Sequence, residues 1–470
     1  MLPLLFVSLL VSAPPAPAEV VVGRDARTGV ALTIYGQQDL ALVRETRGAE
    51  LAAGDDTLRF DDVPARLDPT TVTLGATDDP ASLVVLEQSY LNDLASPQTL
   101  VDRWVGRPVE LVEDDDRLRS RVTSATLLGT AGGNVYQIGD RIAVGHPGWL
   151  QLPPLGAEVF TRPTLRWRVA NGGATRRTLA LSYATGGLSW SADWVLTLAP
   201  DTDRADLQAW ATLVNQSGAR YDDAALVLMS GQVNRARPMP MQARFEAKAM
   251  DMAAAPPPPP EPESFGDLYR YAVERRTSLG ENETKQIPLL SARDVAVKKR
   301  YELRGEGWWF HQPMRDRDRR VPVAVLLEIA NTKANGLGRD LPAGTVRAYQ
   351  TDSGGARVLV GEDALRQTAA DETVSLRLGQ ATDVVATRTQ TDWRKVSVEP
   401  FQSESAWEVT VRNQKKTPVT VEVRDRIDGD WQIVESDPPA RKADAQTLAV
   451  DMPVPAGGQA VARYRVRIGQ

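Results

Sequence analysis

The chain has 470 residues, a formal net charge of −6 and no cysteine. The length suits roughly three domains of ~150 residues each, and 42% of the residues are hydrophobic, which is enough for a sizeable core. The acidic balance, with a pI near 5.3, argues against nucleic acid as a partner, because nucleic-acid binding needs clustered positive charge. The absence of cysteine excludes disulfides, thiolate nucleophiles and cysteine-based zinc sites.

The N-terminus predicts a signal peptide over residues 1–18. Residues 2–11 form a short apolar run, and Ala16-Pro17-Ala18 fits the small-residue pattern of a cleavage site. The run is too short to span a bilayer, although no Lys or Arg precedes it. The alternative is a buried N-terminal strand, which the nearby prolines disfavour. We therefore expect export to the periplasm, the outer surface or the medium. No other stretch approaches transmembrane length, so we expect no transmembrane segment after signal removal.

Residues 19–105 predict an N-terminal β domain. Val30, Leu32 and Ile34 alternate with small or polar residues, as on a strand with one apolar face. Ser96-Pro97 then predicts a short helix, with the serine as N-cap and the proline in the first helical position. Residues 106–156 hold four or five short strand patterns separated by tight turns. That pattern fits a small β-barrel-like domain.

Residues 157–320 predict a central β-sandwich. Trp190, Trp194 and Leu198 share one face of an alternating stretch, and further strands are expected at 207–214 and 224–229. Residues 234–264 contain eight prolines among thirty-one residues, so they predict a disordered Pro-rich loop. Strand patterns resume after it, which indicates that the loop interrupts one domain.

Residues 321–470 predict a C-terminal β-sandwich, with strands expected at 321–329, 374–378, 407–411, 419–423 and 462–468. Residues 361–367 predict one of the few short helices. The fold class is therefore mainly β, with several antiparallel β-sandwich or barrel domains and few short helices. We expect at least about 40% strand and under about 15% helix.

Three stretches together resemble a known family. They are Leu32-Thr33-Ile34-Tyr35 with Ala41-Leu42-Val43-Arg44, Leu188-Ser189-Trp190-Ser191-Ala192-Asp193-Trp194 with Asn215-Gln216-Ser217-Gly218, and residues 330–338 with Leu341-Pro342-Ala343-Gly344. The chain resembles mucoidy inhibitor A-like bacterial envelope proteins, a domain-of-unknown-function family. This resemblance implies a β-rich fold and an envelope setting, and it supplies no catalytic residues.

Residues that could carry chemistry are sparse. His146 and His311 are the only histidines, and neither has a partner at metal-ligand spacing. We therefore predict no metal, no cofactor and no catalytic residue. Acidic pairs occur at 55–56, 61–62, 114–116 and 222–223. Most lie in predicted turns, where an aspartate bonds its own backbone.

Trp308, Trp309 and Phe310 form the candidate binding surface. If the three lie on a strand, neighbouring side chains point to opposite faces and at least one Trp is exposed. An exposed ring can stack on a sugar or anchor a protein contact. Packing beneath the Pro-rich loop is the more common role for such residues, since most Trp side chains are largely buried.

These observations favour an exported, non-enzymatic envelope β protein. It would be a structural or interaction module whose partner is an envelope protein or a surface polysaccharide. The alternative is a carbohydrate-active hydrolase that uses paired carboxylates, which would need two such groups about 5–10 Å apart.

The first prediction concerns export. We expect cleavage after Ala18, so N-terminal sequencing of the native protein should begin near Glu19. A chain that keeps Met1 and fractionates with the cytoplasm would contradict the signal peptide.

Overall fold

The computed structural model describes residues 19–36, 38–91, 97–114, 120–153, 162–199, 203–231, 233–234, 264–265, 268–314, 318–352, 354–399 and 401–469. The predicted signal peptide and nearly all of the predicted loop at 234–264 lie outside these residues. Strands make up 67% of the structure and helix 6%, which confirms the mainly β fold class. Within the described residues, no helix has the length and hydropathy to cross a bilayer.

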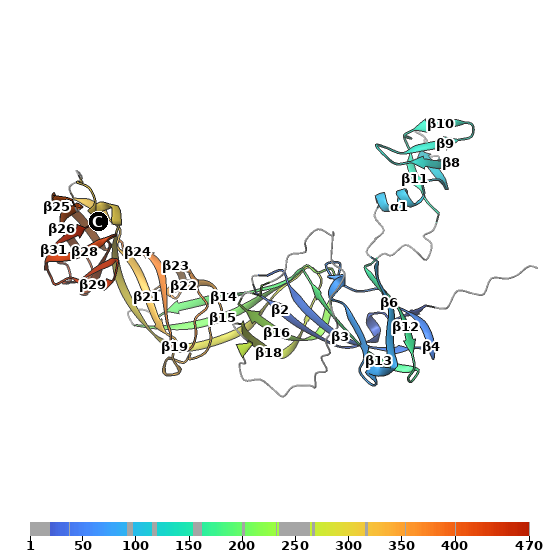
Figure 1. Cartoon of the computed structure of the whole chain (residues 1–470), viewed down its shortest axis with the longest axis horizontal. Coiled ribbons are helices and arrows are strands. Elements are labelled where there is room, and N and C mark those ends of the chain that lie inside the picture. Colours follow the sequence, from blue (N-terminus) through green and yellow to red (C-terminus); the bar gives the residue numbers. More distant parts are fainter. Residues whose placement is uncertain are drawn as a thin grey trace, which may run out of the picture.

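Two sheets form the N-terminal and middle parts of the molecule (Figure 1). The four-stranded sheet has the order β1 (Val20–Val21), β4 (Gly54–Phe60), β12 (Thr164–Asn171) and β6 (Leu83–Leu91). The seven-stranded sheet has the order β17 (Ser264–Phe265), β18 (Leu268–Leu279), β16 (Tyr221–Ser230), β2 (Arg27–Tyr35), β3 (Ala41–Glu50), β13 (Arg176–Thr185) and β5 (Thr73–Ala76).

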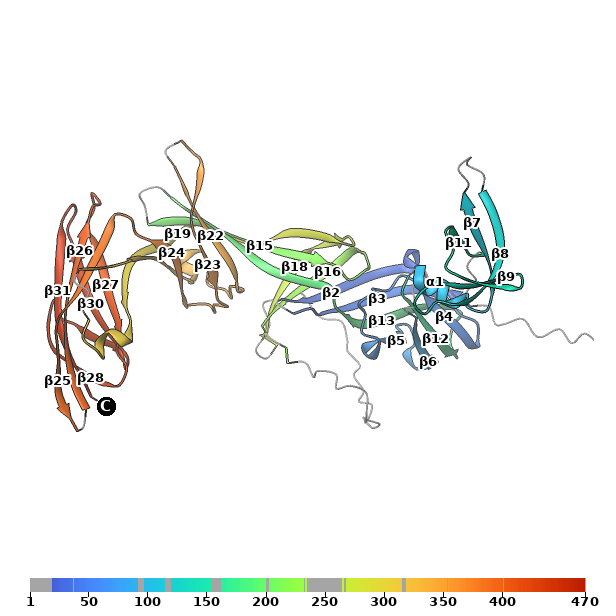
Figure 2. The ribbon, with the colours of Figure 1, turned by 90° about the horizontal axis from the view of Figure 1, so that it is seen from above.

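A ten-stranded sheet continues from the middle of the molecule into its C-terminal part (Figure 2). Its main path is β23 (Arg357–Leu365), β22 (Gly344–Thr351), β14 (Leu188–Leu198), β15 (Arg204–Asn215), β19 (Glu283–Gly305), β27 (Val419–Arg426), β30 (Thr447–Val454) and β29 (Arg441–Asp444). Off this path, β21 (Ala324–Ala330) pairs with β19 and β24 (Thr373–Gln380). A five-stranded sheet completes the C-terminal sandwich, with β20 (Arg319–Val321), β25 (Val384–Val398), β26 (Phe401–Asn413), β31 (Gln459–Gly469) and β28 (Asp430–Asp437).

The apolar faces of these strands bury two large cores. The first core joins the N-terminal sheets to β14 and β15, and Trp167, Trp190 and Trp194 lie in it. The second core lies in the C-terminal sandwich, around Trp407 and Trp431. Both cores cross the predicted domain boundary at 320/321, because Ile329 and Leu376 pack in the first core while Tyr301 and Leu303 pack in the second.

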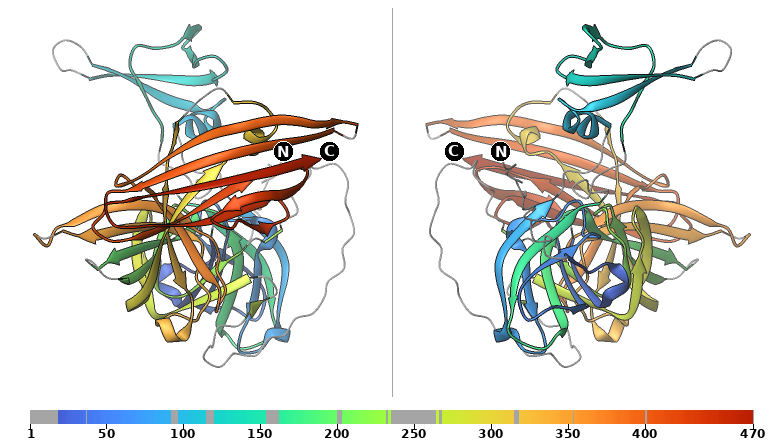
Figure 3. Two further views of the ribbon diagram at one scale, coloured as in Figure 1. Left: turned by 90° about the vertical axis from the view of Figure 1, so that its left-hand side faces the viewer. Right: turned by 90° about the vertical axis from the view of Figure 1, so that its right-hand side faces the viewer.

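A small sheet projects to the side of the long axis (Figure 3). Its strands run in the order β10 (Arg141–Val144), β9 (Val135–Ile138), β8 (Ser120–Gly129), β7 (Pro108–Asp114) and β11 (Trp149–Gln151). The helix α1 (Pro97–Arg103) begins at Pro97 as predicted. Just after it, Trp104 packs with Leu111, Leu127 and Tyr136 in a third core. The sheet is open, with β10 and β11 as its edges, and the described residues contain no closed barrel. The barrel suggested by the short strands is therefore not formed.

Two local predictions are wrong. The helix expected at 361–367 is largely strand, because β23 pairs with β22 and this pairing overrides the helix propensity of its Glu, Ala and Leu residues. The strand expected at 321–329 is broken into β20 and β21. Pro322 lies at the break. Proline has no backbone N–H to donate to a neighbouring strand, so it interrupts the pairing.

Four buried asparagines close turns at strand ends. Asn413 ends β26, and its side-chain amide donates to the backbone carbonyls of Thr417 (2.9 Å) and Pro455 (3.1 Å). Its Oδ1 accepts from the backbone N–H of Lys415 at 3.0 Å. One side chain therefore holds the turn and joins it to the strand next to it.

The same arrangement recurs three times. Asn215 ends β15, donates to the carbonyls of Ala219 and Gly280, and accepts from the N–H of Ser217. Asn171 does the same at the end of β12, and Asn331 does so over a longer loop after β21. All four side chains are at most 2% exposed. We call these four residues the asparagine clamps.

The second prediction tests one clamp. In Asn413→Asp, a carboxylate oxygen would replace the amide nitrogen and face two carbonyl oxygens. We expect a loss of about 3 kcal/mol, since each buried group left unpaired costs about 1–3 kcal/mol. Asn282→Asp is the matched control, because Asn282 is an exposed turn residue at φ 55° that Asp can also occupy. Thermal unfolding measures both variants, and equal midpoints would contradict the clamp.

Candidate functional site

The candidate binding surface lies at the start of the C-terminal sandwich. Trp308, Trp309 and Phe310 belong to a 3-10 helix, η4 (Gly307–Phe310), that directly follows β19. The expected strand is therefore wrong. One Trp is nevertheless exposed and the other buried, because successive residues of a 3-10 helix point in directions about 120° apart.

The three predicted residues divide between core and surface. Trp309 is 5% exposed and Phe310 is fully buried, and both pack in the second core. Trp308 is 50% exposed, and its ring meets that of Trp309 edge-on at a centroid distance of 6.2 Å. Of the three, only Trp308 offers its ring to a partner.

A buried ion pair supports this segment from below. Arg388 donates both terminal nitrogens to Asp425, each at 2.6 Å, and one of them also lies 2.7 Å from the Tyr464 hydroxyl. The guanidinium carbon lies 4.9 Å from the ring centroid of Trp309 and 4.3 Å from that of Trp407. Asp425 therefore neutralises the Arg388 guanidinium in the plane of that group, and aromatic rings cover it. A buried charge requires such partners.

Two members of this cluster, Arg388 and Tyr464, have raised pKa values. Burial alone would lower the pKa of Arg388, but Asp425 and Tyr464 together outweigh burial and the pKa is raised. Burial raises the pKa of Tyr464 well above its usual value, so its hydroxyl stays protonated. Gly305 completes the packing, since a side chain there would clash with Asp425 and Arg388. These features make η4 a firmly held base for the exposed Trp308.

The two histidines have local roles. The Nδ1 of His146 accepts the backbone N–H of Gly148 at 3.0 Å, which closes a turn. His311 follows η4 and is half-buried. Among the described residues, no three His, Cys, Asp or Glu side chains gather in a way that could hold a metal ion.

The acidic pairs bind their own turns or arginines. Asp56 accepts the backbone N–H groups of Ala52 and Thr57, and Asp222 and Asp223 pair with Arg220 and Arg276. Asp62 is buried against Arg47 and Arg27. Asp114 accepts from the Ser120 hydroxyl, and the rest of the 114–116 pattern lies outside the described residues.

An ion-pair ladder covers the five-stranded C-terminal sheet. Glu404 is bound by Arg394 at 2.6 Å and by Arg467 at 2.7 Å. Burial would raise the pKa of Glu404, but hydrogen bonds from these arginines outweigh burial and lower it. A hydrogen bond from Arg465 likewise lowers the pKa of Asp392. A general acid needs the opposite shift, so these carboxylates suit a structural ladder.

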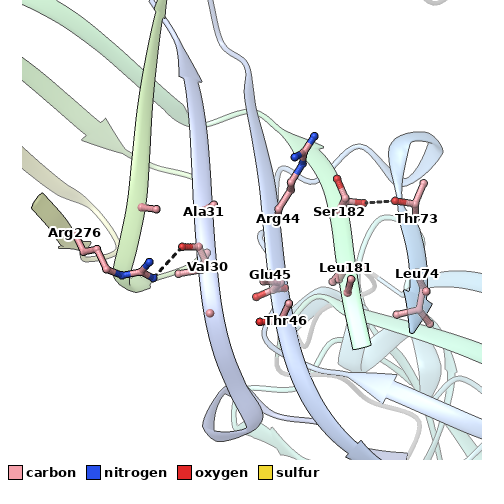
Figure 4. A pocket seen from close by; sticks show the side chains of 14 residues that line it. Val30, Ala31, Arg44, Glu45, Thr46, Thr73, Leu74, Leu181, Ser182 and Arg276 are labelled. Atoms are coloured by element: carbon pink, nitrogen blue, oxygen red, sulfur yellow. Dashed lines mark hydrogen bonds between the residues drawn. The ribbon is translucent and has the colours of Figure 1, made fainter. Parts of the chain in front are cut away.

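Sequence reasoning missed an open groove of about 590 Å³ on the outer face of the seven-stranded sheet. Its floor is made of small residues from five strands, among them Ala31, Ala180 and Ala225. Figure 4 shows Arg44 pointing away from the sheet and Arg276 reaching Val30. The sequence signal for this groove is the Ala and Gly residues at outward-facing strand positions. They stand on separate strands, and only the strand register brings them together.

The groove does not present paired carboxylates. Glu45 is its only acidic lining residue, and its side chain is turned to the buried face of the sheet. There it pairs with Arg27 at 2.6 Å and Arg47 at 3.0 Å. The groove therefore offers an apolar floor beside the exposed guanidinium of Arg44, which has no ion-pair partner among the described residues.

Comparison with known families gives one match. A family model described as a domain of unknown function (DUF4139) matches residues 179–469. The matched region runs from β13 to the end of β31 and includes β19, η4 and the Arg388 cluster. The small sheet and the whole four-stranded sheet lie before it. A comparison with curated proteins found no match.

The third prediction separates the two tryptophans. Trp309→Ala should cost about 3–5 kcal/mol, as expected for a buried Trp, because it opens a cavity against Trp407 and Arg388. Trp308→Ala should cost under about 1 kcal/mol, because half of the side chain is already in water. Thermal unfolding of each variant measures the difference. Similar large losses in both would show that Trp308 belongs to the core.

Proposed function

The chain belongs to the family of the domain of unknown function DUF4139, and we propose that it is an exported interaction module of the bacterial cell envelope. Within that family we assign it to the mucoidy inhibitor A-like proteins. It would act without catalysis and contact an envelope protein or a surface polysaccharide through Trp308.

The exposed Trp308 on a rigid base is the observation that carries this proposal. The side chain is half-exposed, yet its backbone lies in a four-residue helix whose next two side chains are buried. Binding to a ring that is already held in place requires little ordering, so more of the contact energy remains for affinity. Trp is also the residue type most enriched among interface hot spots.

Export rests on the sequence. The apolar run at 2–11 and Ala16-Pro17-Ala18 support a signal peptide. A chain without cysteine needs no oxidising compartment to fold, and a core of this size supplies stability without disulfides. The family resemblance and the predicted signal peptide together support a location in the cell envelope.

The hydrolase alternative has less support. It would need one carboxylic acid of raised pKa facing a second carboxylate across a cleft. Buried acidic groups of the described residues are joined by arginines, as Glu45 and Asp62 are. The described groove offers an apolar floor in place of such a pair.

The fourth prediction tests the contact at Trp308 in living cells. A photo-reactive benzophenone amino acid would replace Trp308 in the full chain, and the same group at the exposed turn residue Glu281 would be the matched control. We expect a discrete adduct at position 308 in the envelope fraction and none at position 281. Protease or glycosidase treatment then shows whether the partner is protein or polysaccharide.

Two results would overturn the proposal. One is recovery of the chain in the cytoplasm with its first eighteen residues intact. The other is an envelope-located chain that gives no adduct at position 308, or equal adducts at both positions.

A further inference from the structure

The small sheet has one face covered and one face open. Leu111, Leu127 and Tyr136 point to the covered side and pack with Trp104. Because strand residues alternate between faces, the residues between them point to the open side. This open face includes Trp149 and Gln151 of β11, Glu110 of β7, and Ser124 and Gln137 of β8 and β9, all of which are exposed.

A row of three apolar residues, the apolar row, crosses one end of the open face. Trp149 pairs with Val112, and Val112 pairs with Val122, so the three lie side by side on neighbouring strands. Trp149 is 53% exposed and Val122 54%, while Val112 is buried between them. The row therefore presents the exposed Trp149 ring beside the buried side chain of Val112.

A polar row lies next to the apolar row. Gln151 pairs with Glu110, and Glu110 pairs with Ser124, so their side chains line up across the same three strands. No side-chain hydrogen bond or ion pair joins any of the three to another described residue. The two rows are two residues apart along the strands, which is about 7 Å. An amide, a carboxylate and a hydroxyl are thus free to bond a ligand that rests on Trp149.

We infer that this open face binds a neutral polysaccharide. A sugar ring has an apolar face that stacks on an indole and a rim of hydroxyls that exchange hydrogen bonds with amide, carboxylate and hydroxyl groups. The face carries two carboxylates, Glu110 and Asp114, and neither of its two rows contains a Lys or Arg. That charge disfavours anionic glycans, nucleic acid and acidic membranes.

A protein partner fits this face less well. A protein interface buries a central apolar cluster within a polar rim. Here the exposed apolar side chains lie toward the two ends of the face, Trp149 and Val122 at one end and Ile142 and Val144 at the other, and the polar row crosses between them. Three unpaired polar side chains would each need a matched group on a protein. A polysaccharide chain supplies hydroxyls along its whole length.

The fifth prediction uses the full mature chain and defined probes. The probes are dextran, a β-1,4-glucan oligomer, xylan, and carboxymethylated dextran of the same length as the neutral dextran. We expect saturable binding to at least one neutral probe by titration calorimetry. We expect carboxymethylation to weaken dextran binding if dextran is that probe, because Glu110 repels the added charges.

Variants locate the binding face. Trp149→Ala should weaken binding at least about tenfold, as for an aromatic hot spot, whereas Trp149→Phe should keep most of it. Gln151→Ala and Ser124→Ala should each weaken binding about threefold, as expected for one lost hydrogen bond. Leu359→Ala is the control and should leave glycan binding unchanged, since Leu359 is as exposed as Trp149 but lies on β23, outside the small sheet and away from Trp308. Circular dichroism confirms that each variant is folded.

Three results would overturn the inference. They are the absence of saturable binding to any neutral probe, unchanged binding by folded Trp149→Ala, and a photo-reactive group at position 149 that captures only protein. Because the Trp308 proposal is tested by adducts at another position, either proposal can fail while the other stands.

Discussion

Strand β19 is the constraint on which the rest of the structure depends. Its 23 residues form one continuous strand, and its side chains enter both large cores. Ala292 and Val295 pack in the first core, and Tyr301 and Leu303 pack in the second. A β-bulge opposite Asp206, with Asp294 at φ 54°, turns the strand where it leaves β15 and meets β21. A shared strand leaves no linker between the cores, so the two parts are held in one orientation.

The same strand positions the candidate site. Gly305 ends β19 against the Arg388–Asp425 pair, and η4 begins two residues later. Any movement of β19 would therefore disturb a buried bidentate ion pair, which is strongly destabilising when one partner is lost. The rigidity of Trp308 is thus a consequence of the fold. A ring placed by a flexible loop would lose more entropy on binding.

Much of the fold could be predicted from alternation, because a period of two fixes which residues face a core. The strands around Trp190, Trp407 and Tyr464 follow it directly. The candidate site could be predicted only in part, since one short window cannot distinguish a 3-10 turn from a strand at Gly307–Phe310. The asparagine clamps recur at 171, 215, 331 and 413 without a fixed spacing. A search for periodic repeats therefore overlooks them, whereas a search for Asn at strand ends would find them.

The open face of the small sheet could not be predicted from the sequence, for a different reason. Nothing in β11, a three-residue strand, marks Trp149 as exposed, and the short patterns of β7 to β10 fit a closed barrel as well as an open sheet. Closure would have paired β10 with β11, whereas these two strands are the edges of the sheet. The open face places Trp149, Gln151, Glu110 and Ser124 in two neighbouring rows, which an extended chain of repeating units can follow. In Figure 1 the small sheet and the C-terminal sandwich, against which η4 packs, lie toward opposite ends of the molecule. Two proposed contact surfaces so far apart would let the protein join two partners, and joining them requires a rigid connection more than it requires a catalytic centre.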